Sequence, residues 1–234
     1  MLTIAHVAIA TLSESIYAEP SASGGRKGPN ILYIFTDDQS TRTVSCYEGA
    51  RPWAQTPNID KLADSGMRFT TCYTGAWCQP SRASALSGLL QHALKTLKIT
   101  NYPMATYDPE QFRFFPSVFR KNGYETACIG KWHLGDDVGH GRDWDYSVIW
   151  DRGAGNAGAY YNGTLVRTNG GDRKPLGGYS TDRYTELAVD YIKGKKSDDK
   201  PWYLWLCYGG VHGPYTPATR HNNSYGDAPS SKIP

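Results

Sequence analysis

The chain has 234 residues, a formal net charge of +3 and a hydrophobic content of 39%. The nearly balanced charge argues against DNA or RNA as the main partner, because nucleic-acid-binding proteins carry a clustered basic excess. The apolar content is high enough to offset the entropy cost of ordering the chain, which argues against global disorder. The length fits one domain or a large part of a bigger one.

The N-terminal residues have the pattern of an export signal. The longest apolar stretch runs from Leu2 to Leu12, which is shorter than the ~20 residues that span a bilayer. We therefore expect residues 1–28 to be a signal peptide and a flexible lead-in, with no stable membrane insertion. This predicts a periplasmic or secreted location.

The next segments alternate between strand and helix patterns. Residues 31–35 are an apolar run rich in β-formers, typical of a strand buried on both faces. Thr56-Pro57 predicts the start of a helix that ends at Ser65-Gly66. The alternating residues 67–73 predict a strand. Three further elements follow in the chain, namely helices over 80–90 and 116–122 and a strand over 124–129.

The second half contains a less regular segment. Residues 136–179 are rich in Gly, Asp, Asn and aromatic residues, so we expect a surface excursion with a hairpin at Asn162-Gly163, which suits a type I′ turn. The aromatic side chains of this segment either stack on a ligand or form a small core of their own. The four are Trp144, Trp150, Tyr160 and Tyr161. Residues 180–196 predict an amphipathic helix and 202–208 a buried strand. The alternation predicts an α/β fold with a mainly parallel sheet flanked by helices.

Polar side chains follow three of the predicted strands. Asp37 and Asp38 come after the first strand, Lys131 and His133 after the strand at 124–129, and His212 after the strand at 202–208. Sites in open α/β sheets lie at the carboxyl ends of the strands. We expect these side chains to converge there, with Lys131 and His133 on one side of an extended chain because they are two residues apart.

A cysteine lies where a helix is predicted to begin. Pro80 favours a helix start just after Cys78. The free N–H groups and dipole of a helix N-terminus favour anions and lower a thiol pKa. Arg82 lies one turn further on and can reach back toward Cys78.

Four motifs in this order resemble the sulfatase family, which belongs to the alkaline-phosphatase-like superfamily. They are PNILYIFTDDQ (29–39), TPNID (56–60), CQPSR (78–82) and GKWHLG (130–135). The resemblance runs from about Pro29 to Pro217. It implies an alkaline-phosphatase-like fold, with residues 29–234 as an N-terminal catalytic domain. Family members supply a further acidic–amide metal pair and a second lysine from beyond this length, so the chain is interpreted as an N-terminal fragment with an incomplete fold.

The resemblance also implies a modified residue and a metal. Cys78 matches the cysteine that a formylglycine-generating enzyme oxidises to formylglycine, whose hydrated aldehyde is the nucleophile. Asp37 and Asp38, together with the modified Cys78, match the ligands of a divalent cation, Ca²⁺ or another such as Mg²⁺. Hard cations of this kind prefer oxygen ligands and can neutralise the charge of a sulfate group.

The remaining matched residues imply roles around the sulfate group. Arg82 resembles the arginine that holds the modified residue, Lys131 and His133 the groups that bind sulfate, and His212 the histidine near the leaving-group oxygen. These roles predict hydrolysis of a sulfated small molecule or glycan to sulfate and an alcohol, with no nucleic acid partner. Two alternatives remain open: a phosphonate or phosphate-diester hydrolase of the same superfamily, or a non-catalytic fragment that binds sulfated glycans.

Overall fold

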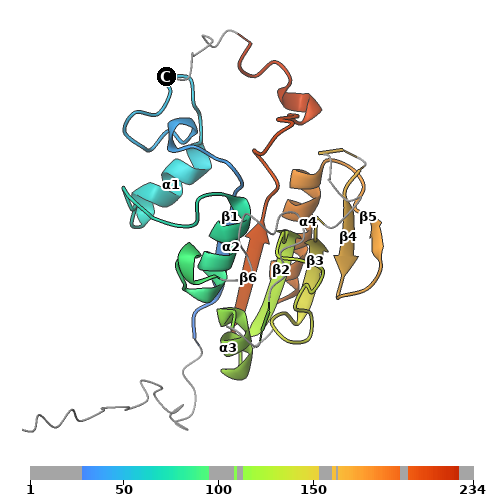
Figure 1. Ribbon diagram of the computed structural model, residues 1–234. Helices are drawn as coiled ribbons and strands as arrows, with labels where there is room; N and C mark the ends of the chain where they lie inside the picture. The colour runs from blue at the N-terminus through green and yellow to red at the C-terminus, as the bar shows by residue number, and fades with distance from the viewer. Residues whose placement is uncertain are drawn as a thin grey trace, which may run out of the picture.

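The computed structural model describes residues 28–94, 108–109, 113–152, 160–161, 163–195 and 200–226. They form a six-stranded sheet in the order β1-β6-β2-β3-β4-β5 (Figure 1). The first four strands in that order are parallel: β1 (Ile31–Phe35), β6 (Trp202–Cys207), β2 (Glu125–Lys131) and β3 (Tyr146–Trp150). The last two are antiparallel: β4 (Leu165–Thr168) and β5 (Arg173–Pro175). The expected mainly parallel α/β sheet is confirmed.

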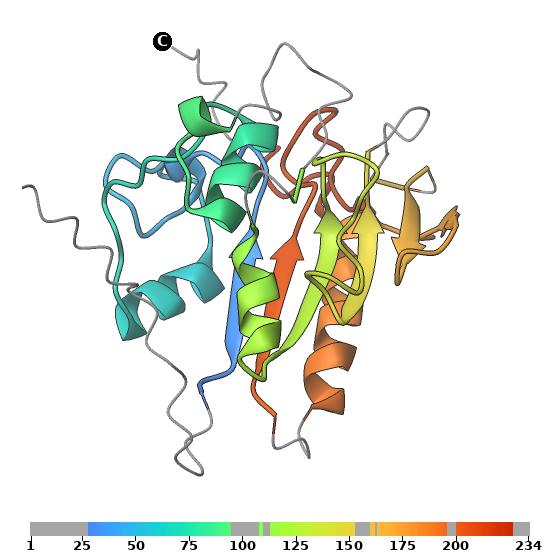
Figure 2. The ribbon, with the colours of Figure 1, turned by 60° about the horizontal axis from the view of Figure 1, so that its bottom comes forward.

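Helices cover both faces of the sheet. Figure 2 shows α3 (Phe115–Lys121) on one side and α4 (Ser180–Gly194) on the other. Alternate residues of β6 separate two cores: Trp205 packs in the core that includes residues of α2 (Cys78–Ser87), and Leu204 packs in the core that includes residues of α4. Because β6 is buried along its whole length, it is the centre of this three-layer arrangement.

The helix ends follow the proline and glycine signals. The helix α1 (Pro57–Ser65) begins after Thr56 and ends at Gly66, and α2 ends at Gly88 in the left-handed conformation (φ 71°). Such a glycine stops a helix without strain because it has no Cβ. Within the described residues there are also three short 3₁₀ segments: η1 (Thr41–Thr43), η2 (Gln91–Ala93) and η4 (Thr219–His221).

Two strand predictions in the first half are wrong in part. The strand at 31–35 is present, but it pairs only with β6 in the described sheet, so it is an edge strand and Leu32 and Ile34 are 43% and 49% exposed. Residues 67–73 form no strand, because no neighbouring strand pairs with them and their side chains are exposed. Alternation alone therefore did not identify a strand here.

The segment 136–179 also differs from expectation. It contains β3, whose three central residues are buried, so part of it belongs to the core sheet rather than to a surface excursion. The hairpin joins β4 to β5 through Asn169-Gly170, with φ of 49° and 72°. These left-handed values are what an Asn-Gly hairpin turn requires. Asn162 and residues 1–27 lie outside the described residues.

The five cysteines are free thiols. Within the described ranges, no helix is both long enough and apolar enough to cross a bilayer.

Candidate active site

The candidate site lies where three parallel strands end. Figure 2 shows β1, β6 and β2 pointing to the same edge of the sheet. The chain after β1 is tied to the turn after β6, because Asp37 N–H donates to the Gly210 carbonyl (2.9 Å) and Val211 N–H donates to the Asp37 carbonyl (2.7 Å). The fold thus brings the segments around Asp37, Lys131 and His212 together at one edge of the sheet, as predicted.

Asp37, Arg82 and Lys131 form a buried ion cluster, named below by these three residues. Asp37 Oδ2 accepts hydrogen bonds from Arg82 Nη2, at 3.2 Å, and from Lys131 Nζ. Arg82 Nη1 also donates to the Lys131 carbonyl at 2.8 Å. None of the three is more than 2% exposed. One carboxylate faces two cations, so the cluster carries an excess positive charge that suits an anionic ligand.

Neighbouring charges set the pKa values in this cluster. Burial alone would raise the pKa of Asp37, but the positive charges of Arg82 and Lys131 outweigh it and hold that pKa below its usual value. Burial, followed by the charge of Arg82, lowers the pKa of Lys131, while Asp37 acts in the opposite direction. The pairing with Asp37 therefore favours the charged form of the lysine.

Cys78 is the first residue of α2, as its spacing from Pro80 predicts. Its Sγ lies 3.3 Å from Nδ1 of His133, and both residues are buried. Burial lowers the pKa of His133 to about 3, with smaller contributions from the charges of Lys131 and Arg152. The imidazole is therefore neutral at neutral pH, and its Nδ1 is within hydrogen-bond distance of the Cys78 sulfur.

His133 reaches Cys78 by a different backbone path from the one expected. β2 ends at Lys131, and His133 has a left-handed backbone with φ of 61°. The predicted extended geometry for Lys131 and His133 is therefore wrong, although both are buried and close to other predicted site residues. A left-handed non-glycine residue is costly, and such residues concentrate at functional sites.

His212 and Asp38 lie on the solvent side of the ion cluster. His212 Nε2 is 3.8 Å from Asp38 Oδ2, and both side chains are partly exposed. His212 Nδ1 lies 2.8 Å from the Gly213 carbonyl. A carbonyl can only accept, so Nδ1 carries hydrogen and Nε2 is the atom directed toward Asp38. The Tyr160 hydroxyl donates to the His212 carbonyl and steadies this turn.

The carboxylates provide only part of a metal site. In the described ranges, no three His, Cys, Asp or Glu side chains come together in a way that could hold a metal ion. Asp37 faces Arg82 and Lys131, whereas Asp38 faces His212. The donors present therefore do not complete a cation shell, and the set Asp37, Asp38 and Cys78 stays a prediction.

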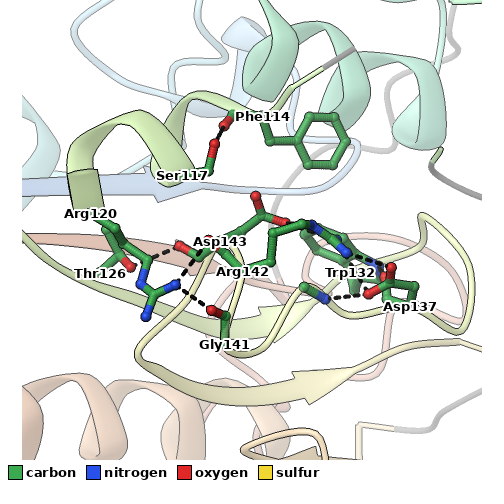
Figure 3. A network of polar contacts seen from close by, with 10 residues as sticks. Phe114, Ser117, Arg120, Thr126, Trp132, Asp137, Gly141, Arg142 and Asp143 are labelled. Carbon is green, nitrogen blue, oxygen red and sulfur yellow. Dashed lines mark hydrogen bonds and ion pairs between the residues drawn. The ribbon is translucent and has the colours of Figure 1, made fainter. Parts of the chain in front are cut away.

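A polar network supports the residue between Lys131 and His133. Trp132 Nε1 donates to the Asp137 carbonyl at 3.1 Å, and the Arg142 guanidinium bonds the carboxylates of Asp137 and Asp143 (Figure 3). Trp132 is fully buried. Burial raises the pKa of Asp143 to about 6 despite the opposing charge of Arg142. This network holds Trp132 in the core and so fixes the chain that carries both site residues.

A pocket of about 40 Å³ opens beside His212. Its walls include the rings of Trp150 and Tyr160 and the side chain of Arg152. Of the rings expected either to stack on a ligand or to pack internally, Trp144 is fully buried in the core, while Trp150 and Tyr160 line this pocket. Sequence reasoning missed Arg152, because no motif marks it and only the fold places it near His212.

Comparison with known proteins gives a consistent result. The family model described as Sulfatase matches residues 29–231. An N-acetylglucosamine-6-O-sulfatase of Bacteroides thetaiotaomicron is 32% identical over 214 residues, covering 91% of this chain and 36% of that protein. An N-acetylgalactosamine-6-sulfatase of Canis lupus familiaris is 26% identical, covering 88% of this chain and 45% of that protein. The chain thus spans less than half the length of these curated relatives.

Solved structures show the same similarity in three dimensions. One, a protein in complex with its substrate D-glucosamine-2-N,6-O-disulfate, matches with a TM-score of 0.74 and 32% identity, over 86% of this chain and 38% of that chain. A protein of the alkaline phosphatase superfamily from Vibrio parahaemolyticus matches with a TM-score of 0.55 and 17% identity, over 83% of this chain and 44% of that chain. The latter supports the fold alone.

Proposed function

The chain belongs to the sulfatase family, and from this premise we propose that it provides catalytic residues for the hydrolysis of sulfate esters. In this reaction water is added across the bond between sulfur and the ester oxygen, which releases sulfate and an alcohol. The observation that carries the proposal is the buried ion cluster together with the buried Cys78 thiol, whose sulfur lies 3.3 Å from Nδ1 of His133.

The electrostatics of the site suit a sulfate ester. The ester carries a negative charge that repels nucleophiles, so a site must supply positive charge where the sulfate oxygens lie. Arg82 and Lys131 place two buried cations against one carboxylate. In a buried site, charges that are already fixed in position need no reorganisation when the anion binds.

We propose that Cys78 is converted to formylglycine, whose hydrated aldehyde supplies the nucleophilic oxygen. Around it, the chain's own residues hold and move protons. His133 is neutral at neutral pH and its Nδ1 lies 3.3 Å from the Cys78 sulfur, so it is placed to hold this side chain by a hydrogen bond. When both ring nitrogens of His212 carry hydrogen, its Nε2, beside Asp38, is placed to donate a proton to the departing alcohol oxygen.

A divalent cation remains part of the proposal. Asp37 and Asp38 would contribute two of its ligands, and Ca²⁺ or Mg²⁺ would supply further positive charge next to the sulfate. The described residues do not complete its shell, so no step is assigned to it. Maturation by a formylglycine-generating enzyme and a periplasmic or secreted location also remain proposals.

The relatives suggest the class of substrate. The two curated relatives described above are named for 6-sulfated amino sugars. The solved structure with a TM-score of 0.74 holds a sulfated glucosamine. We propose a sulfated sugar as the substrate here. The pocket beside His212 supports this proposal, because the rings of Trp150 and Tyr160 offer apolar surface to the face of a sugar.

The test is to replace Cys78 in protein produced together with a formylglycine-generating enzyme. Cys78→Ala should abolish release of sulfate from 4-nitrophenyl sulfate and from glucosamine 6-sulfate, while the circular dichroism spectrum stays unchanged. Peptide mass spectrometry of the parent protein should show the aldehyde at Cys78. Residual turnover above a hundredth of the parent rate would contradict the nucleophile role. Faster turnover of an aryl phosphonate than of the aryl sulfate would favour the phosphonate alternative.

A further inference from the structure

A second and larger cavity, named here the aromatic groove, opens at the same edge of the sheet. Its volume is about 670 Å³, which falls within the roughly 300–1,000 Å³ typical of ligand sites. One wall comes from the segment after β1 and the other mainly from the segment after β6. Six aromatic side chains line it: Trp53, Tyr160, Tyr179, Tyr208, Tyr215 and Tyr225.

The aromatic groove offers rings and uncharged polar groups. Among the described residues that line it, none is Asp, Glu, Lys, Arg or His. Its polar side chains include Thr36, Gln39 and Thr181. An anionic group would find no counter-charge here. An uncharged sugar, in contrast, presents C–H faces to aromatic rings and hydroxyl groups to polar side chains, so this lining matches a sugar.

Some of the rings are fixed by their neighbours and others present open faces. Tyr160 and Tyr179 stack with their ring centroids 5.8 Å apart, and the Tyr179 hydroxyl donates to the Thr216 carbonyl at 3.0 Å. Tyr215 and Tyr225 are instead 73% and 48% exposed. Tyr215 also has a left-handed backbone with φ of 59°, which is costly for a bulky residue and is found most often at ligand sites. The groove therefore combines a fixed part with rings that a ligand can cover.

The aromatic groove adjoins the candidate active site along both walls. On one wall, the lining residue Thr36 directly precedes Asp37, and on the other, Val211 directly precedes His212. Tyr160 lines both the groove and the pocket beside His212. A glycan whose leaving-group oxygen lies at His212 can therefore continue into the groove with its next sugar unit.

We propose that the aromatic groove binds an uncharged sugar unit next to the sulfated one, so that the preferred substrate is a sulfated oligosaccharide rather than a free monosaccharide. The open faces of Tyr215 and Tyr225 contact the sugar ring, and Thr36 and Gln39 bond its hydroxyls. This inference rests on the proposed function for the position of the sulfated unit. A groove that seats a polypeptide segment instead would not bind the sugar chain, and binding measurements separate the two occupants.

The test compares sugars of different length on the chain with unmodified Cys78. Isothermal titration calorimetry would use N-acetylglucosamine 6-sulfate and a triacetylchitotriose that carries 6-sulfate on its non-reducing end. The parent should bind the sulfated trisaccharide about 10-fold or more tightly, because the added units cover the exposed rings. The unsulfated trisaccharide should give saturation-transfer NMR signals, since the groove itself recognises no charge.

The variants are chosen so that folding does not confuse the result. Tyr215→Asn removes an exposed ring, and asparagine tolerates the left-handed backbone. It should weaken the sulfated trisaccharide about 5- to 10-fold and the monosaccharide less than about twofold. Tyr215→Phe keeps the ring and should retain the preference. Tyr73→Asn is the matched control, because Tyr73 is 90% exposed and does not line the groove; both affinities should stay unchanged.

Three results would overturn the inference. The first is equal affinity of the parent for the two sulfated sugars. The second is an unchanged preference when Tyr215→Asn and Tyr225→Asn are combined. The third is a lack of saturation transfer to the unsulfated trisaccharide, which would favour a polypeptide occupant. Failure of the proposed function looks different: parent protein with formylglycine at position 78 would release no sulfate from either sulfated sugar, although ring-dependent binding of the unsulfated trisaccharide persisted.

Discussion

Replacing Asp37 by asparagine tests the ion cluster directly. Asp37 is 2% exposed and is the carboxylate that faces both Arg82 and Lys131, each 0% exposed. At the 3.2 Å separation from Arg82, an effective dielectric constant of about 20 gives a gross attraction of about 5 kcal/mol for that pair alone. Asp37→Asn leaves two buried cations without a counter-charge, and breaking a buried pair in this way costs about 3–5 kcal/mol.

Lys131→Met should cost less. It leaves the Arg82–Asp37 pair, which is balanced in charge, so no buried charge is left without a counter-charge. The variant loses the hydrogen bond from Lys131 to Asp37, and a hydrogen bond to a charged group contributes about 1.5–3 kcal/mol. We therefore expect a smaller loss of unfolding free energy than for Asp37→Asn.

The assay is urea unfolding at pH 7 with a chelator present, followed by tryptophan fluorescence. Asp38→Asn is the matched control, since the Asp38 side chain is 47% exposed and surface changes usually stay within about 0.5 kcal/mol. If Asp37→Asn and Lys131→Met destabilise the protein equally, the argument from charge imbalance is wrong. A cost below 1 kcal/mol for Asp37→Asn would show that the cluster does not form in solution.

Three further predictions address the backbone, a buried acid and the proton donor. Gly130→Ala should lower the free energy of unfolding by more than about 3 kcal/mol or prevent folding, because the added Cβ would lie 1.8 Å from the Cys207 carbonyl oxygen and the residue has φ of 111°. Gly194→Ala is the control, because there is open space around Gly194. Equal urea midpoints for the two variants would refute the clash. The raised pKa of Asp143, about 6 against 3.8, means that the folded state holds this proton more tightly, so stability should fall by about 2 kcal/mol from pH 4 to 6. Asp143→Asn should flatten that decline in urea titrations across pH, and an unchanged slope would exclude Asp143 as its source. In protein that carries formylglycine at position 78, His212→Ala should slow hydrolysis of sugar sulfates about 10-fold more than hydrolysis of 4-nitrophenyl sulfate, because the 4-nitrophenolate leaving group needs no proton. Equal losses in kcat for the two substrates would rule out the proton-donor role.

Local signals predicted much of the fold and the site. Prolines marked the starts of α1 and α2 and a glycine marked the end of α1, because their backbone preferences act within a few residues. The predicted end of the second helix at residue 90 is wrong, because α2 stops before Gly88. The same signal placed Cys78 at the start of α2. The alternation of strands and helices predicted a parallel sheet. Because sites in such sheets follow strand ends, the sequence also identified Asp37, Lys131 and His212 as candidate site residues.

The tertiary structure decided what depends on partners distant in sequence. The position of β1 at the edge of the described sheet, which exposes Leu32 and Ile34, depends on strand order. The left-handed backbone at His133 and the buried partners of Asp37 are also set by packing. Arg152 belongs to no motif, and the fold places it in the same pocket wall as His212, which is 60 residues further along the chain. A sequence determines local conformation through short-range sterics, whereas these contacts result from long-range packing of the whole sheet.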